Sequence, residues 1–166
     1  MAGMIGQLID NLNEQESRYA DLLGLSLEKR GVIVANDIEG LQKITHLENI
    51  LISQNQKLEK KRIELTKDIA MVINANESEL TVGSLADMLD GQEEQAALRE
   101  TGSKLKKTVS ELTEANGFNA SLIDNALDYV EFSLNLIRSA VEQNPAFYSV
   151  IGEPIRNEKG IFDARH

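Results

Sequence analysis

Proline is absent from residues 1–144 and occurs only at Pro145 and Pro154. Because proline removes a backbone donor and clashes with the preceding helical turn, its absence permits long helices throughout this range. Hydrophobic residues make up 42% of the chain, enough for a packed core, and a length of 166 residues suits one domain. We therefore predict an all-α protein built from a few long helices.

The first helix is expected over about residues 4–34. The segment ANDIEG follows it, where Asn36 or Asp37 can cap a second helix and Glu39 favours the first turn of that helix. So short a connection makes the two helices antiparallel neighbours. The apolar residues of the first helix recur at three- and four-residue steps, typical of an amphipathic helix: Ile5, Leu8, Leu12, Tyr19, Leu22, Leu23 and Leu27.

The second helix is expected over about residues 37–73. Its apolar positions follow a heptad pattern with three polar interruptions, which lower stability but can fix the register of packing. These positions, the predicted seam, are Leu41, Ile44, Glu48, Leu51, Asn55, Leu58, Arg62, Leu65, Ile69 and Val72. A long antiparallel helical hairpin is the expected product.

Residues 74–93 break the heptad pattern. Thr81 is a plausible cap, and Gly91 can end a short helix over about residues 84–90. A third long helix is expected over residues 92–143, weakened but not shifted in phase by Gly102 and Gly117. We expect residues 1–143 to form a single helical bundle domain, three-helix and coiled-coil-like, and residues 144–166, with both prolines and no period, to form a flexible tail.

The last part of the third helix, LIDNALDYVEFSLNLIRSAV at residues 122–141, is apolar over far more than the roughly 100° that a surface helix needs. The second sector is formed by Tyr129, Phe132 and Leu136, and the pattern leaves open whether it is core or a binding surface. Six of the seven aromatic residues lie between positions 118 and 162, and aromatic residues are favoured binding anchors. The first sector, which we predict to be core, contains Leu122, Ile123, Ala126, Leu127, Val130, Leu134, Ile137 and Val141.

Composition argues against several functions. The net charge of −10 disfavours nucleic-acid binding, which needs a basic face, and no run of apolar residues is long enough to span a membrane. Cysteine is absent, and His46 and His166 cannot by themselves form a zinc site or a proton relay. We expect a cytoplasmic protein that is not an enzyme and that binds no metal or cofactor.

Several segments together resemble the FlgN-type flagellar export chaperones. They are the turn NDIEGLQKITHLENILI, the interruption ELTVGSLADML, the final helix LIDNALDYVEFSLNLI and the ending FDARH at residues 162–166, where Phe and His replace Tyr and Gly of the family's YDARG-like ending. The resemblance implies a cytoplasmic chaperone of the flagellar type III secretion system. Such chaperones bind hook–filament junction (hook-associated) proteins, chiefly through the C-terminal segments of these clients. They prevent premature assembly and deliver the clients to the export gate.

We predict that clients bind through Tyr129, Phe132 and Leu136 of the final helix together with Phe147 and Tyr148 of the tail. The alternative for the two tail residues is a structureless segment. A component of the export gate is a further candidate partner, and nothing in the sequence favours Tyr129 over Tyr148 as its contact. Homodimer formation is also left open. The rival interpretation is a structural coiled-coil or adaptor protein whose helix seams drive self-association.

Overall fold

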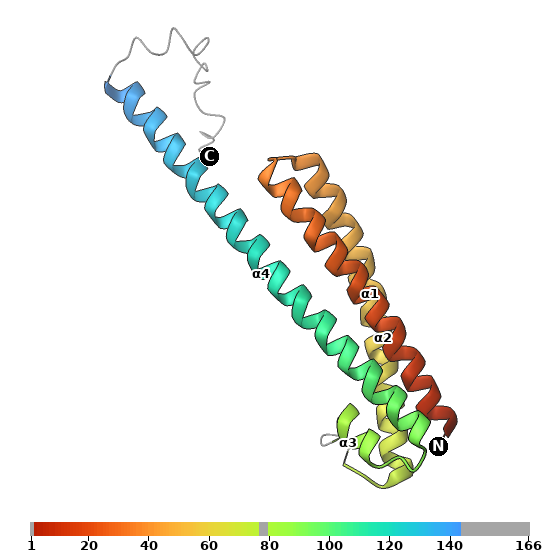
Figure 1. The fold of residues 1–166 in the computed structure, drawn as a ribbon. Helices are drawn as coiled ribbons and strands as arrows, with labels where there is room; N and C mark the ends of the chain where they lie inside the picture. Colours follow the sequence, from red (N-terminus) through yellow and green to blue (C-terminus); the bar gives the residue numbers. More distant parts are fainter. Residues whose placement is uncertain (1, 77–79, 144–166) are drawn as a thin grey trace, which may run out of the picture. The chain divides into compact units, whose positions relative to one another are not determined.

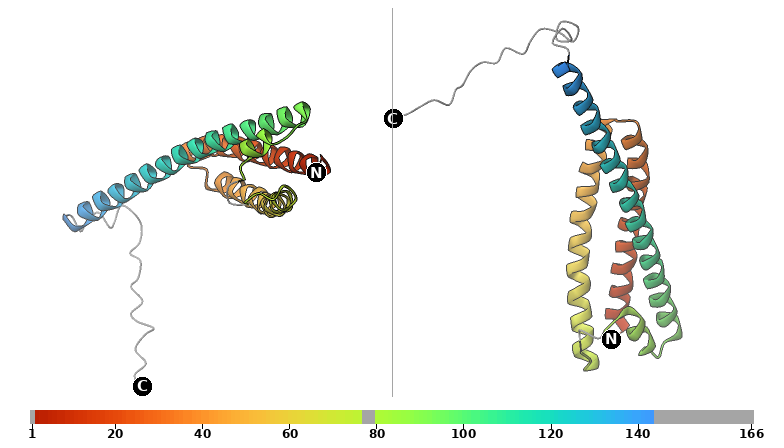
Figure 2. Two further views of the ribbon diagram at one scale, coloured as in Figure 1. Left: turned by 90° about the horizontal axis from the view of Figure 1, so that it is seen from below. Right: turned by 90° about the vertical axis from the view of Figure 1, so that its left-hand side faces the viewer.

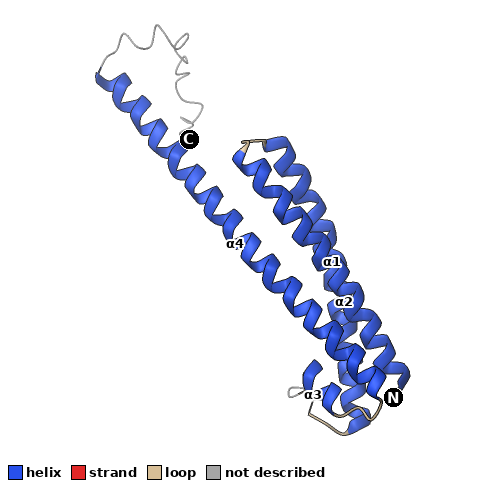
Figure 3. Ribbon diagram, viewed as in Figure 1, coloured by secondary structure: helices blue, strands red, loops and turns tan. Residues whose placement is uncertain are grey.

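The computed structural model describes residues 2–76 and 80–143, and every described element is an α-helix (Figures 1 and 3). The helices are α1 (Ala2–Val34), α2 (Ile38–Ile73), α3 (Val82–Asp87) and α4 (Gln92–Gln143). The predicted all-α fold is confirmed: a long antiparallel hairpin, a short helix in the connection and a third long helix.

The turn between α1 and α2 is built by two consecutive polar residues. Asn36 has a φ of 53°, a left-handed conformation that asparagine tolerates better than most residues. Asp37 is the N-cap of α2, and its Oδ1 accepts a hydrogen bond from the Gly40 backbone N–H at 2.9 Å. The predicted cap at this turn is therefore confirmed.

Helices α1 and α2 pack side by side along their length (Figure 2). Asn11 Nδ2 donates to the Leu58 carbonyl at 3.2 Å, whereas Lys29 forms an ion pair with Glu48 nearer the turn. Residues later in α1 thus contact residues earlier in α2, as an antiparallel hairpin requires.

The predicted seam of α2 is correct over most of its length but wrong at its last position. Ile44, Asn55, Leu65 and Ile69 are buried, whereas Val72 is exposed and Ile73 packs against the core instead. A straight α-helix drifts about 20° per heptad relative to a perfect 3.5-residue repeat. After several heptads, Ile73 therefore faces inward instead of Val72.

The short helix α3 begins two residues earlier than predicted and ends at Asp87 rather than at position 90. A capping box sets its start, because Thr81 Oγ1 accepts from the Ser84 N–H at 3.0 Å while Ser84 Oγ accepts from the Thr81 N–H at 2.9 Å. Gly91 belongs to the start of α4, since its carbonyl accepts from the Gln95 N–H at 2.9 Å.

The apolar core lies at one end of the hairpin, where α3 and the start of α4 meet the N-terminal part of α1 and the C-terminal part of α2 (Figure 1). Gln95 Nε2 donates to the Ala86 carbonyl at 2.9 Å and ties α3 to α4. The core cluster consists of Ile5, Leu8, Leu12, Leu65, Ile69, Leu85, Ala86 and Leu98.

Beyond this core, α4 is held along α1 by polar side chains. Buried Glu16 accepts from Thr108 Oγ1 at 3.0 Å and from Lys104 Nζ at 3.1 Å. Farther along, Asn119 Nδ2 donates to the Ser26 carbonyl at 2.7 Å. Because residue numbers rise together on both helices, α1 and this part of α4 are parallel.

The chain divides into two compact units, Met1–Ile123 and Asp124–His166. Helix α4 is one helix, as predicted, and its residues after position 123 are the described part of the second unit. The domain boundary expected at residue 143 stays a prediction.

Candidate functional site

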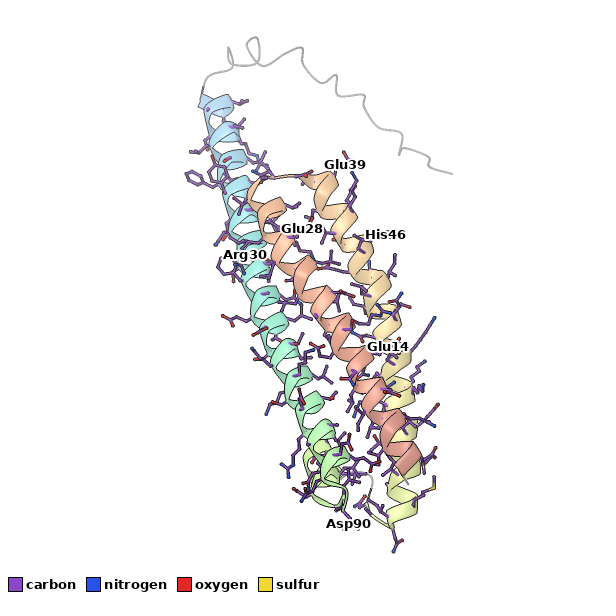
Figure 4. The ribbon with its side chains drawn as sticks, turned by 45° about the vertical axis from the view of Figure 1, so that its right-hand side comes forward. Glu14, Glu28, Arg30, Glu39, His46 and Asp90 are labelled. Atoms are coloured by element: carbon purple, nitrogen blue, oxygen red, sulfur yellow. The ribbon has the colours of Figure 1, made fainter. Side chains whose placement is uncertain are left out.

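Metal-binding groups and membrane-spanning helices are the first features to consider. Among them, no group of three or more histidine, cysteine, aspartate or glutamate side chains is placed to hold a metal ion. His46 is exposed on the outer side of α2 (Figure 4). Within the described ranges, no helix combines the length and the apolar character needed to cross a membrane.

The most unusual surface is on the last part of α4, where no residue between Asp124 and Glu142 is buried. Tyr129 is 71% exposed, Phe132 60% and Leu136 56%. These side chains lie at positions i, i+3 and i+7 of one helix and therefore share a face. The structure thus places the three predicted residues of α4 together on an uncovered surface.

The prediction that the first sector of this helix is core is wrong for four of its large side chains. Leu127, Val130, Leu134 and Ile137 are all more than half exposed. Their spacing showed an apolar face but could not show whether that face is covered by this chain or by another molecule. Both apolar sectors of residues 124–142 are therefore available to a partner.

A polar sector completes the circumference of this helix. It carries Asp124, Asp128, Glu131, Asn135 and Arg138, so it is predominantly acidic. Residues 124–142 therefore form an amphipathic helix whose apolar side chains are exposed. We name the large apolar side chains of both sectors the α4 face: Leu127, Tyr129, Val130, Phe132, Leu134, Leu136 and Ile137.

The two tail residues of the predicted site, Phe147 and Tyr148, lie outside the described residues. Their part in the site stays a prediction.

A second surface feature, which sequence reasoning missed, is a pair of hollows inside the first unit. One has a volume of about 420 Å³ and the other about 370 Å³, and both are lined by Tyr19, Leu22 and Ile52. The heptad pattern contained one signal that could have indicated these hollows, because polar Asn55 interrupts the seam of α2 and lines the smaller hollow.

Several charged groups around the hollows are paired. Lys29 and Glu48 form an ion pair at the wall of the larger hollow. At the smaller one, Arg62 donates to both Glu59 oxygens, at 2.6 and 2.8 Å, and this hydrogen bonding holds the pKa of the Glu59 carboxyl below its ordinary value. Arg30, on the side of α1 that faces α4, stacks over the Phe118 ring at 4.2 Å from its centroid (Figure 4).

The candidate site is thus an exposed apolar surface on α4. No curated protein and no solved structure is significantly similar to the chain. The family model described as FlgN protein matches residues 1–154. The chain therefore belongs to the FlgN family, a family of flagellar export chaperones.

Proposed function

We propose that this protein binds hook–filament junction proteins in the cytoplasm and holds them unassembled until they are exported. Family membership supports the general role of export chaperone. The observation that supports the binding site is that every side chain of the α4 face is more than half exposed. An uncovered apolar surface of this kind marks an interaction site.

The α4 face can supply enough free energy for a functional complex. Full burial of a large apolar side chain contributes about 1.5–3 kcal/mol, and roughly half to two-thirds of each of these side chains is still exposed. Its seven members together therefore offer about 6–12 kcal/mol. Association costs at least about 4 kcal/mol, which leaves at most about 8 kcal/mol, the free energy of a micromolar complex. Tail aromatics or a second contact would strengthen it.

The bound segment is expected to be an amphipathic helix from the C-terminal part of the client. Its apolar residues would contact the α4 face, and basic residues at its edge would meet Asp124, Asp128 and Glu131. We include Phe147 and Tyr148 in the interface as additional anchors. We also propose that the loaded chaperone delivers its client to a component of the export gate.

The decisive experiment is the substitution Phe132→Asp, measured by isothermal titration with a peptide from the C-terminal segment of a junction protein of the same bacterium. Phe132 is largely exposed, so the variant should keep its helical circular dichroism while its affinity for the client falls at least tenfold. The matched control is Asn135→Asp, which adds the same charge to the polar sector of the same helix. The proposal fails if Phe132→Asp binds as tightly as this control.

The rival function, self-association, makes a different prediction for the isolated chain. A structural coiled-coil protein would cover the α4 face with a second copy, so sedimentation should give a stable oligomer from which client peptide is excluded. A chain whose α4 face is free for clients should bind the peptide with one site per subunit.

A further inference from the structure

The two hollows of the first unit form one groove, because they share Tyr19, Leu22 and Ile52. Every residue that lines the groove belongs to residues 1–123, so the groove is separate from the α4 face. Its lining comes from α1, α2 and α4 and combines apolar side chains with polar ones such as Asn55 and Gln56. Its charged lining residues balance, with Lys29 and Lys60 against Glu48 and Glu59.

Two asparagine side chains in this groove have polar atoms without a hydrogen-bond partner. Asn55, on α2, is 6% exposed, and neither its Oδ1 nor its Nδ2 is bonded. Asn119, on α4, is 3% exposed and donates to Ser26, but its Oδ1 has no partner. Unpaired buried polar groups are rare in folded proteins, and each one calls for an explanation.

The chemistry of these groups indicates what would satisfy them. An asparagine amide offers one acceptor and a donor, which match the N–H and C=O of a polypeptide main chain. Because the free protein already carries the cost of burying Asn55 without a partner, a hydrogen bond from an occupant adds affinity with little further desolvation. The electrically neutral lining, with both apolar and polar side chains, suits a polypeptide segment and offers no excess of positive charge for phosphate groups.

We propose that this groove is a second client site, in which a segment of the bound junction protein lies between α1, α2 and α4 and pairs its main chain with the amide of Asn55. This inference rests on the proposed function, since it assigns a second contact to the same client. The occupant reaches the buried amide by displacing a wall side chain, and exposed Ile52 has the freedom to move. A client that occupies both sites would bind more tightly than the modest affinity expected from the α4 face alone.

The test is Asn55→Leu, with Gln54→Leu as the matched control on the exposed side of the same helix. Replacing an unpaired buried amide with leucine should leave the Tm of the free chain unchanged or raised. The affinity for the client's C-terminal segment should nevertheless fall about tenfold, while Gln54→Leu should bind within about twofold of wild type. An Asn55→Leu chain that binds as tightly as the control overturns the proposal and leaves Asn55 as a residue that fixes register.

A direct measurement keeps the proposal testable if Asn55→Leu folds poorly. In the wild-type protein, the Asn55 side-chain NH2 resonances should shift on saturation with the client peptide. Unchanged resonances at saturation overturn the proposal. Two control results without client also overturn the proposal. If removal of residues 144–166 shifts the Asn55 resonances, the tail is the occupant. If a higher protein concentration shifts them, the occupant is a second copy of the chain.

The two proposals fail in different ways. If the proposed function is wrong, wild-type protein does not bind the peptide or Phe132→Asp binds it normally. If only the groove inference is wrong, Phe132→Asp loses binding as expected while Asn55→Leu keeps it.

Discussion

Leu98 and Leu134 lie on the same helix and carry the same side chain, yet their truncation should have very different effects on stability. Leu98 is completely buried in the cluster that joins α4 to Ile5, Leu8 and Leu85, whereas Leu134 is 56% exposed. The pair therefore tests whether α4 is anchored at its apolar end alone and leaves its last part uncovered.

The expected magnitudes follow from burial. Leu98→Ala removes a fully packed side chain and leaves a cavity, which costs about 2–5 kcal/mol. At about 3 °C per kcal/mol for a chain of this size, its Tm should fall by about 6–15 °C. Less than half of Leu134 is covered, so Leu134→Ala should cost less than about 1 kcal/mol and lower the Tm by less than about 3 °C.

Thermal unfolding followed by far-UV circular dichroism, without client, measures both values. The reasoning is refuted if Leu134→Ala lowers the Tm as much as Leu98→Ala, because the end of α4 would then be packed in the free protein. A loss below about 3 °C for Leu98→Ala would instead show that α4 is not anchored by the apolar cluster.

Two further predictions concern an ion pair and two glycines. Arg62 lowers the folded-state pKa of Glu59 below its ordinary value of 4.5, so the ionised carboxylate stabilises the fold above that pH and loses its effect as the pH falls through the lowered pKa. Glu59→Gln should therefore reduce the Tm slightly at neutral pH, and a difference from wild type that persists undiminished in acid would contradict this assignment. Gly117→Ala should stabilise α4 by about 1 kcal/mol, because its new Cβ meets nothing within 4 Å. Gly102→Ala should gain less or destabilise, because its Cβ would lie 2.7 Å from Val82 Cγ1; equal gains in Tm for the two variants would contradict the packing of α3 on α4.

Much of the fold could be predicted because the signals are local. Asp37 caps α2 with its own side chain, and Thr81 caps α3 through a partner three residues away. The spacing of apolar residues gave the long helices, and the short turn made the hairpin antiparallel. The errors at Val72 and at the ends of α3 are shifts of one to three residues, which arise from helical drift and from a capping box whose partner was not recognised.

The candidate site could be predicted only in part. The apolar arc of the final helix and the position of Tyr129, Phe132 and Leu136 on one face follow from helix geometry. The exposure of Leu127, Val130, Leu134 and Ile137 does not follow from helix geometry. The only sequence signal for the groove was the polar residue Asn55 at a heptad position of α2.

The sequence by itself determined that the chain forms three long helices, where the turn between the first two lies, and which side of each helix is apolar, because these depend mainly on neighbours within four residues. Only the tertiary structure decided which apolar sides are covered. Leu98 and Leu134 are the same residue on the same helix, but Leu98 belongs to a buried cluster with residues of α1, α2 and α3, whereas Leu134 is exposed. Whether a side chain is buried depends on which residues pack against it, and those residues come from chain segments that are distant in sequence.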